Sequence, residues 1–212
     1  MSLPPPVYDF EAMIDALTGG YWAGGSNLVL SYSIPTAGST WGAYSPGDEP
    51  SGPGFAVLNA EQGASFRAVM ALFDSFVGAT FVETNDLTDQ GAIRVAFSAS
   101  QSSAGHAYMP WSGASAGDRG RSGDIWLNPN HAEGDFAQGS YEWGLIGHEL
   151  GHALGLKHPF EGAAILPAEF DNTRYSILSY TNPPDLWVRT FTGTEGGGIQ
   201  ASAESFPELT PM

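Results

Sequence analysis

Apolar positions along the first 155 residues repeat with the periods of helices and strands. Spacing of i, i+3, i+4 and i+7 predicts helices over residues 10–17, 61–77 and 141–154. Alternating or continuous apolar runs predict strands over five ranges: 28–34, 80–84, 93–98, 105–109 and 124–128. From Gly155 onward the pattern is irregular, so we expect few regular elements in the last quarter of the chain.

The order of these elements indicates the fold class. Strands that alternate with helices along the chain, followed by an irregular tail, predict an α+β fold with a mixed, twisted sheet and two main helices. The chain has 212 residues, of which 42% are apolar, so it can bury one substantial core. We therefore expect a single domain over residues 1–212.

Charge and composition exclude several classes of function. The 7 basic and 23 acidic residues give a formal net charge of −16, which argues against binding to nucleic acid or to anionic membrane surfaces. No stretch approaches the roughly 18 apolar residues of a membrane span. Cysteine is absent, which excludes disulfides and thiolate metal sites. The N-terminus shows no cleavable signal peptide, although few basic residues with many Gly and Ser are typical of secreted chains.

Three of the five histidines fall within eleven residues and have the spacing of metal ligands. His148 and His152 are i and i+4 on the last predicted helix, so both imidazoles lie on one face and can share one ion. Gly155 can end the helix in a left-handed turn and bring His158 back to the same ion. Three His ligands with an open coordination position predict one catalytic Zn²⁺, and Glu149 is placed to accept a proton from water.

The segment HELGHALGLKHP, residues 148–159, resembles the metzincin signature and, with its final Pro, the serralysin family of secreted bacterial metalloproteases. Residues 172–180 resemble the family's turn beneath the zinc, and residues 14–17 with Tyr21 and Trp22 its opening helix. Residues 206–212 (FPELTPM) loosely resemble the segment before its last catalytic-domain helix.

The resemblance implies a metzincin-like zincin whose active-site cleft separates an N-terminal lobe, about 1–155, from a C-terminal lobe, about 156–212. It implies a secreted, monomeric zinc endopeptidase acting on proteins or peptides, with proteinaceous inhibitors as further partners. It also implies that Tyr180 can bind zinc at rest and swing away to donate to the transition-state oxyanion. An exposed edge strand over 105–109 would hold the substrate.

The sequence departs from the family at two points. Leu178 stands where the family has a Met that forms an apolar floor under the ligands, and Leu has nearly the same volume. The calcium-binding glycine repeats of the family are absent, so no motif supports Ca²⁺ in this chain. We expect Asp118 and Asp124 to lie with Arg119 and Arg121 in a surface loop. A calcium-binding role for the two aspartates is an open alternative.

Two other functions stay open at this stage: an inactive zinc-binding module, and a narrow-specificity processing protease. His106 and His131 lack ligand spacing, and we expect both to be solvated residues of a loop or strand edge.

Overall fold

A computed structural model describes residues 9–117, 120–184, 187–193 and 199–205. The chain divides into two compact units, one from Leu17 to Lys157 and one that joins Met1–Ala16 to His158–Met212. The predicted arrangement of lobes 1–155 and 156–212 about a cleft stays a prediction. Residues 206–212, Asp118 and Arg119 lie outside the described residues.

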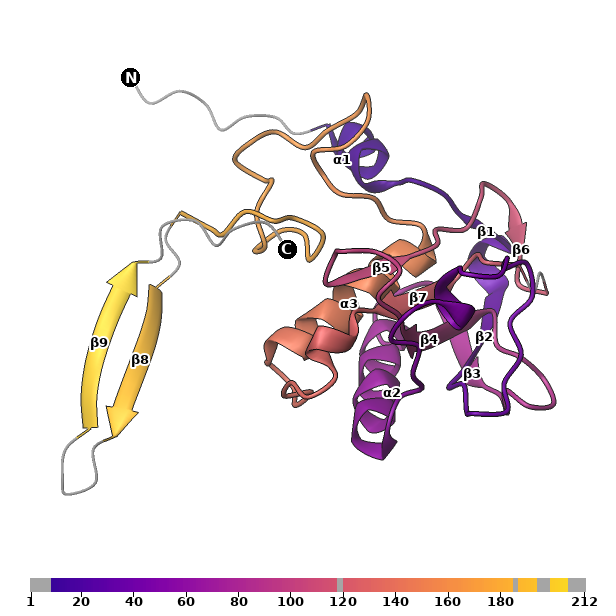
Figure 1. Ribbon diagram of the computed structural model, residues 1–212. Coiled ribbons are helices and arrows are strands. Elements are labelled where there is room, and N and C mark those ends of the chain that lie inside the picture. Colours follow the sequence, from indigo (N-terminus) through magenta and orange to yellow (C-terminus); the bar gives the residue numbers. More distant parts are fainter. Residues whose placement is uncertain (1–8, 118–119, 185–186, 194–198, 206–212) are drawn as a thin grey trace. The chain divides into compact units, whose positions relative to one another are not determined.

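A five-stranded mixed sheet with the order β3-β2-β4-β7-β5 forms the centre of the unit Leu17–Lys157 (Figure 1). Its strands are β2 (Leu28–Ser33), β3 (Ala79–Glu83), β4 (Ile93–Phe97), β5 (Gly105–Ala107) and β7 (Asp124–Leu127). All are parallel to their neighbours except β5, which runs antiparallel to β7 at the edge. The predicted mixed sheet is therefore confirmed. Strand β5 is two residues shorter than predicted, and Pro110, which has no N–H to pair, follows closely.

Three α-helices are present in the described residues: α1 (Phe10–Leu17), α2 (Ala60–Asp74) and α3 (Tyr141–Leu154). Helix α2 begins with a capping box in which Asn59 and Gln62 exchange side-chain-to-backbone hydrogen bonds of 2.8 and 2.9 Å. It ends three residues before the predicted limit, because the Ser75 hydroxyl donates to the Leu72 carbonyl, 2.6 Å away, and the turn tightens there. None of these helices combines the length and apolar character needed to traverse a bilayer.

Strands β4 and β7 are buried on both faces, which explains why their sequences lack strict alternation. On one face, a continuous apolar core joins the sheet to α2 and α3. The sheet residues in this core include Ile93, Val95, Phe97, Ile125 and Leu127, and the helix residues include Phe66, Val69, Phe73, Ile146 and Leu150. Helix α3 packs against β5 and β7, so its position is fixed by the end of the sheet that carries the edge strand.

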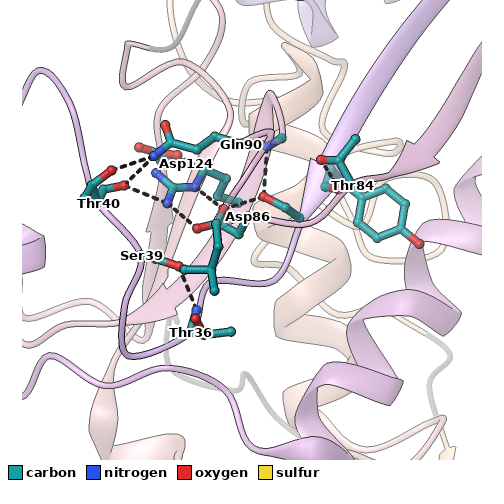
Figure 2. A network of polar contacts seen from close by, with 12 residues as sticks. Thr36, Ser39, Thr40, Thr84, Asp86, Gln90 and Asp124 are labelled. Atoms are coloured by element: carbon teal, nitrogen blue, oxygen red, sulfur yellow. Dashed lines mark hydrogen bonds and ion pairs between the residues drawn. The ribbon is translucent and has the colours of Figure 1, made fainter.

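The opposite face of the sheet is covered by the loop between β2 and α2. Trp41 from this loop stacks between the Arg94 guanidinium, 3.8 Å from its ring centre, and Trp126, at 4.5 Å. Arg94 also donates to both carboxylate oxygens of Asp86, each at 2.8 Å, and to the Thr40 carbonyl, at 2.9 Å; Figure 2 shows this polar network. A buried charge needs such paired and hydrogen-bonded surroundings, so this loop is part of the core and not a loose connection.

Smaller elements complete the described chain. Strands β1 (Trp22–Ala23) and β6 (Ala114–Ser115) form a short parallel pair, and three 3-10 helices span Gly25–Asn27, Glu49–Ser51 and Pro129–His131. In the second unit, β8 (Trp187–Gly193) and β9 (Ile199–Ser205) form an antiparallel hairpin. The predicted irregular tail is thus wrong for residues 187–193 and 199–205; β-branched residues at alternate positions from Val188 favour a strand in the first of these ranges.

Candidate metal centre

Helix α3 holds three side chains of the predicted site in the interior. His148, Glu149 and His152 are 4%, 3% and 8% exposed. The two imidazoles are one helical turn apart, with ring centres separated by 4.9 Å and planes nearly perpendicular. Ser140 caps the start of the helix by accepting from the backbone N–H of Trp143, at 3.2 Å, so the helix that carries these residues has a well-defined beginning.

Gly155 ends α3 and sets the direction of the chain that follows. Its φ of 108° lies in the left-handed region, where a glycine is favoured. Its carbonyl accepts hydrogen bonds from the N–H groups of Gly19 and Gly20, at 2.8 and 3.0 Å, and a Cβ on Gly155 would collide with the Gly20 carbonyl. The predicted glycine turn is confirmed, and the close packing gives glycine a second reason to stand there.

The same turn orients one imidazole. Nδ1 of His152 lies 2.8 Å from the carbonyl oxygen of Leu156, the residue after the glycine. Because a carbonyl only accepts, Nδ1 carries the hydrogen and Nε2 keeps its lone pair. Holding a histidine by its other ring nitrogen is the usual way in which proteins prepare it as a metal ligand.

His158 joins the two helical histidines. One ring nitrogen from each of His148, His152 and His158 can be chosen so that all three lie within 4.8 Å of one another. Neutral imidazoles at this spacing are a donor set that suits zinc, which binds nitrogen at about 2.0–2.1 Å. Oε2 of Glu149 is buried and has no hydrogen-bond partner, which is expected where a site takes up a further group that would supply one. The residues present therefore fit a metal ion.

Tyr180 approaches the third histidine directly. Its hydroxyl oxygen is 2.7 Å from Nε2 of His158, and the two ring centres are 4.7 Å apart. The His158 ring also stacks on Phe160, with centres 5.1 Å apart and planes 9° from parallel. On its other side, Nδ1 of His158 is 2.9 Å from Oε1 of Glu161, an ion-pair distance without the alignment of a hydrogen bond. Tyr180 thus lies beside one of the candidate ligands.

Burial also changes the protonation of Glu149. Removing this carboxyl from water raises its pKa to about 8, so in the metal-free protein it is largely protonated at neutral pH. A cation close by favours the ionised form and opposes this effect. A carboxyl whose pKa lies near neutrality can both accept and return a proton.

Leu178, the predicted floor residue, is 1% exposed. Its backbone N–H lies 3.2 Å from the Ser176 hydroxyl within the turn that contains Tyr180. A fully buried leucine in this turn agrees with a role in packing.

Of two residues that the sequence placed at the surface, Asp124 is buried and His106 is partly buried. Asp124 is 2% exposed and accepts a hydrogen bond of 2.7 Å from the Tyr44 hydroxyl, so its predicted position in a surface loop is wrong. His106 lies in the edge strand β5, as predicted, but it is only partly exposed, because its Nε2 lies 3.0 Å from Oε1 of buried Glu49, which also accepts from the Tyr108 hydroxyl at 2.7 Å. Among the described residues, the three-histidine group is the candidate metal cluster found, and it includes neither of them.

His131 lies in a short 3-10 helix between β7 and α3 and is partly buried. Its ring stacks on Tyr141, with centres 5.2 Å apart.

The site resembles that of a known class of proteins. Two histidines one turn apart, a glutamate beside the first, a left-handed glycine and a third histidine are the arrangement of a metzincin. The chain is 28% identical to serralysin A of Dickeya chrysanthemi over 169 residues, which cover 74% of this chain and 33% of that protein. No family model matches the chain. The resemblance to serralysin-like metzincins that residues 148–159 predict is confirmed, and the chain matches about a third of its relative's length.

Proposed function

We propose that this chain is a zinc-dependent endopeptidase, a hydrolase of the metzincin type that cleaves peptide bonds in protein or peptide substrates. The observation that carries the proposal is the group of His148, His152 and His158 with the buried, unpartnered Oε2 of Glu149 in the middle of the same motif. A purely structural zinc site does not require a buried base, because no proton is transferred there. The similarity to serralysin A supports the same conclusion.

The three histidines would hold one Zn²⁺ through one ring nitrogen each. A zinc ion bound there would polarise a substrate carbonyl and acidify water. Glu149 acts as the general base: its carboxylate takes a proton from the attacking water and returns it to the nitrogen of the departing amine. Burial keeps this carboxylate away from bulk water, which favours transfer of the proton within the site.

Tyr180 is the second proposed catalytic residue. Its hydroxyl lies at Nε2 of His158, so a small movement of the side chain would release it. A phenol that donates to the developing oxyanion stabilises the transition state more than the substrate, which raises turnover. The three histidines hold the metal without help from Tyr180.

Strand β5 is the proposed docking site for the substrate backbone. It lies at the end of the sheet order, so one of its edges has no partner strand among the described residues. An extended peptide can add a strand to such an edge. Pro110 limits the length of the free edge, which protects it from pairing with other chains.

An inactive zinc-binding module and a narrow-specificity processing protease are the alternatives. Casein and a mixed peptide library would be incubated with the zinc-loaded chain, with and without a chelator. We expect cleavage that stops with the chelator and one bound zinc per chain. The chain would also be incubated with proteins secreted by the same organism. Cleavage confined to those proteins would favour the processing protease. That alternative also requires that the chain itself be secreted.

Two variants separate the roles of metal and base. Glu149→Gln keeps the side chain's size but cannot take a proton, so we expect bound zinc to remain and turnover to fall by at least about 10². Replacing both His148 and His152 with Ala should remove the zinc. Unchanged turnover in Glu149→Gln, or stoichiometric zinc in the double variant, would contradict the proposal.

A further inference from the structure

Gly105, the first residue of β5, lies where the edge strand comes closest to the proposed base. A Cβ built on Gly105 would be 2.8 Å from Oε1 of Glu149, 3.0 Å from its Cγ and 3.1 Å from its Cδ. All three distances are shorter than ordinary van der Waals contact. The side chain of Glu149 therefore occupies space that every residue other than glycine would fill at position 105.

The backbone at Gly105 does not itself require glycine. Its φ is not among the positive values found in the described residues, and its conformation is that of a strand paired with Leu127 of β7. Glycine within a strand weakens it, and often marks a place where another group approaches closely. Here the approaching group is a carboxylate, since the nearest atoms to the missing Cβ all belong to Glu149.

The backbones of β5 and α3 are both held in place, so they cannot move apart to make room for a side chain at position 105. Strand β5 pairs with β7 along its length. In addition, the Asn128 N–H donates to the carbonyl of Ala104, the residue before β5, at 2.8 Å. On its outer face, Glu49 binds both His106 and Tyr108 of the strand and its extension. Helix α3 is fixed by its buried contacts with the sheet. The flexible part of the contact is thus the end of the Glu149 side chain.

We propose that Gly105 is a positioning residue for Glu149: by lacking a side chain, it lets the carboxylate lie against the edge strand in the place where it acts on substrate. This inference rests on the proposed role of Glu149 as the general base. An alanine methyl group at position 105 displaces the carboxylate to another rotamer, while the fold survives because the end of a glutamate side chain moves easily. The substitution therefore lowers the rate of catalysis and leaves the fold intact.

Steady-state kinetics of Gly105→Ala would test this, with Gly144→Ala as the matched control. Gly144 lies in α3 itself, and a Cβ there meets no heavy atom within 4 Å. We expect Gly105→Ala to lower kcat by about 10- to 100-fold, with little change in KM and with zinc retained, since a misplacement of about 1 Å can have effects of this size. Gly144→Ala should keep the parent's kcat.

The same substitution in a Glu149→Gln background separates positioning from general damage. Without a functional base, moving the side chain at position 149 removes nothing further, so Gly105→Ala should leave the residual turnover unchanged. A kcat for Gly105→Ala equal to the parent's, an effect on KM alone, or an equal fall in the Glu149→Gln background would each overturn the inference.

Crystal structures of the parent and of Gly105→Ala supply a readout that does not depend on activity. We expect the Glu149 carboxylate to have moved in the variant while β5 and α3 superimpose. An unmoved carboxylate would overturn the inference. A moved carboxylate, together with a parent that cleaves no peptide, would reject the proposed peptidase function and still support placement of Glu149 by Gly105.

Discussion

Replacing Asp124 with Asn should change the stability of this protein in opposite directions at low and high pH. Asp124 lies at the start of β7, 2% exposed, with the Tyr44 hydroxyl donating to its Oδ2. Burial raises its pKa from the ordinary value of 3.8 to about 7, and the nearby carboxylates of Asp86 and Glu49 add to the rise, while Arg94 opposes it. The buried carboxyl is therefore protonated in the folded protein at mildly acidic pH.

The sign of the effect follows from proton binding. Between about pH 4 and pH 7 the unfolded chain has lost this proton and the folded chain keeps it, so the contribution of Asp124 to stability falls as the pH rises. The difference of about 3 pKa units corresponds to roughly 4 kcal/mol above pH 7. Asn cannot ionise, and its carbonyl can still accept from Tyr44, but its NH₂ group gains no assured partner, which costs about 1–3 kcal/mol.

We therefore expect Asp124→Asn to be less stable than the parent by about 1–3 kcal/mol at pH 4 and more stable by about 1–3 kcal/mol at pH 8. Urea unfolding of the metal-free proteins across this range, followed by circular dichroism, measures the difference. Asp15→Asn, at an exposed position of α1, is the control and should show a flat difference. A constant difference between Asp124→Asn and the parent would refute the reasoning, because it would mean that Asp124 is ionised in the fold.

Three further predictions concern the metal centre. Tyr180→Phe should lower turnover by about 10²–10³ with zinc retained and only a modest change in KM; turnover equal to the parent's would make Tyr180 a core residue. Leu178→Met should change zinc affinity and turnover by less than about tenfold, since the two side chains have similar volumes; an inactive parent rescued by Leu178→Met would favour the inactive-module alternative. Glu161→Gln should weaken zinc binding by about tenfold in a chelator competition, because the negative charge of the Glu161 carboxylate, 2.9 Å from Nδ1 of His158, favours a cation on the His158 ring. Exposed Glu169→Gln is its control, and equal affinities in the two variants would count against the role of Glu161.

Local patterns were enough to predict the regular elements that carry the site. Helices 10–17 and 141–154 have their predicted limits, since caps and glycines act on residues a few positions away. The strands of the five-stranded sheet agree to within one or two residues. The strands over 187–193 and 199–205 were missed, because no strict alternation of apolar residues marks them.

The metal ligands were readable from the sequence for the same reason. His148 and His152 meet because a helix repeats every 3.6 residues, and Gly155 reverses the chain at once, so the grouping of the three donors follows from eleven consecutive positions. The identity of the base also follows, since Glu149 is adjacent to the first ligand.

Tertiary structure alone decided what surrounds these residues. Asp124 meets Tyr44, 80 positions away, and His106 meets Glu49, 57 positions away, so a sequence pattern could not show that either side chain is paired. The approach of Glu149 to Gly105 likewise depends on how α3 packs against the edge of the sheet. Such contacts arise from the burial of apolar faces, which acts without regard to distance along the chain. The sequence therefore determined the metal ligands and the base, and packing determined which side chains surround them.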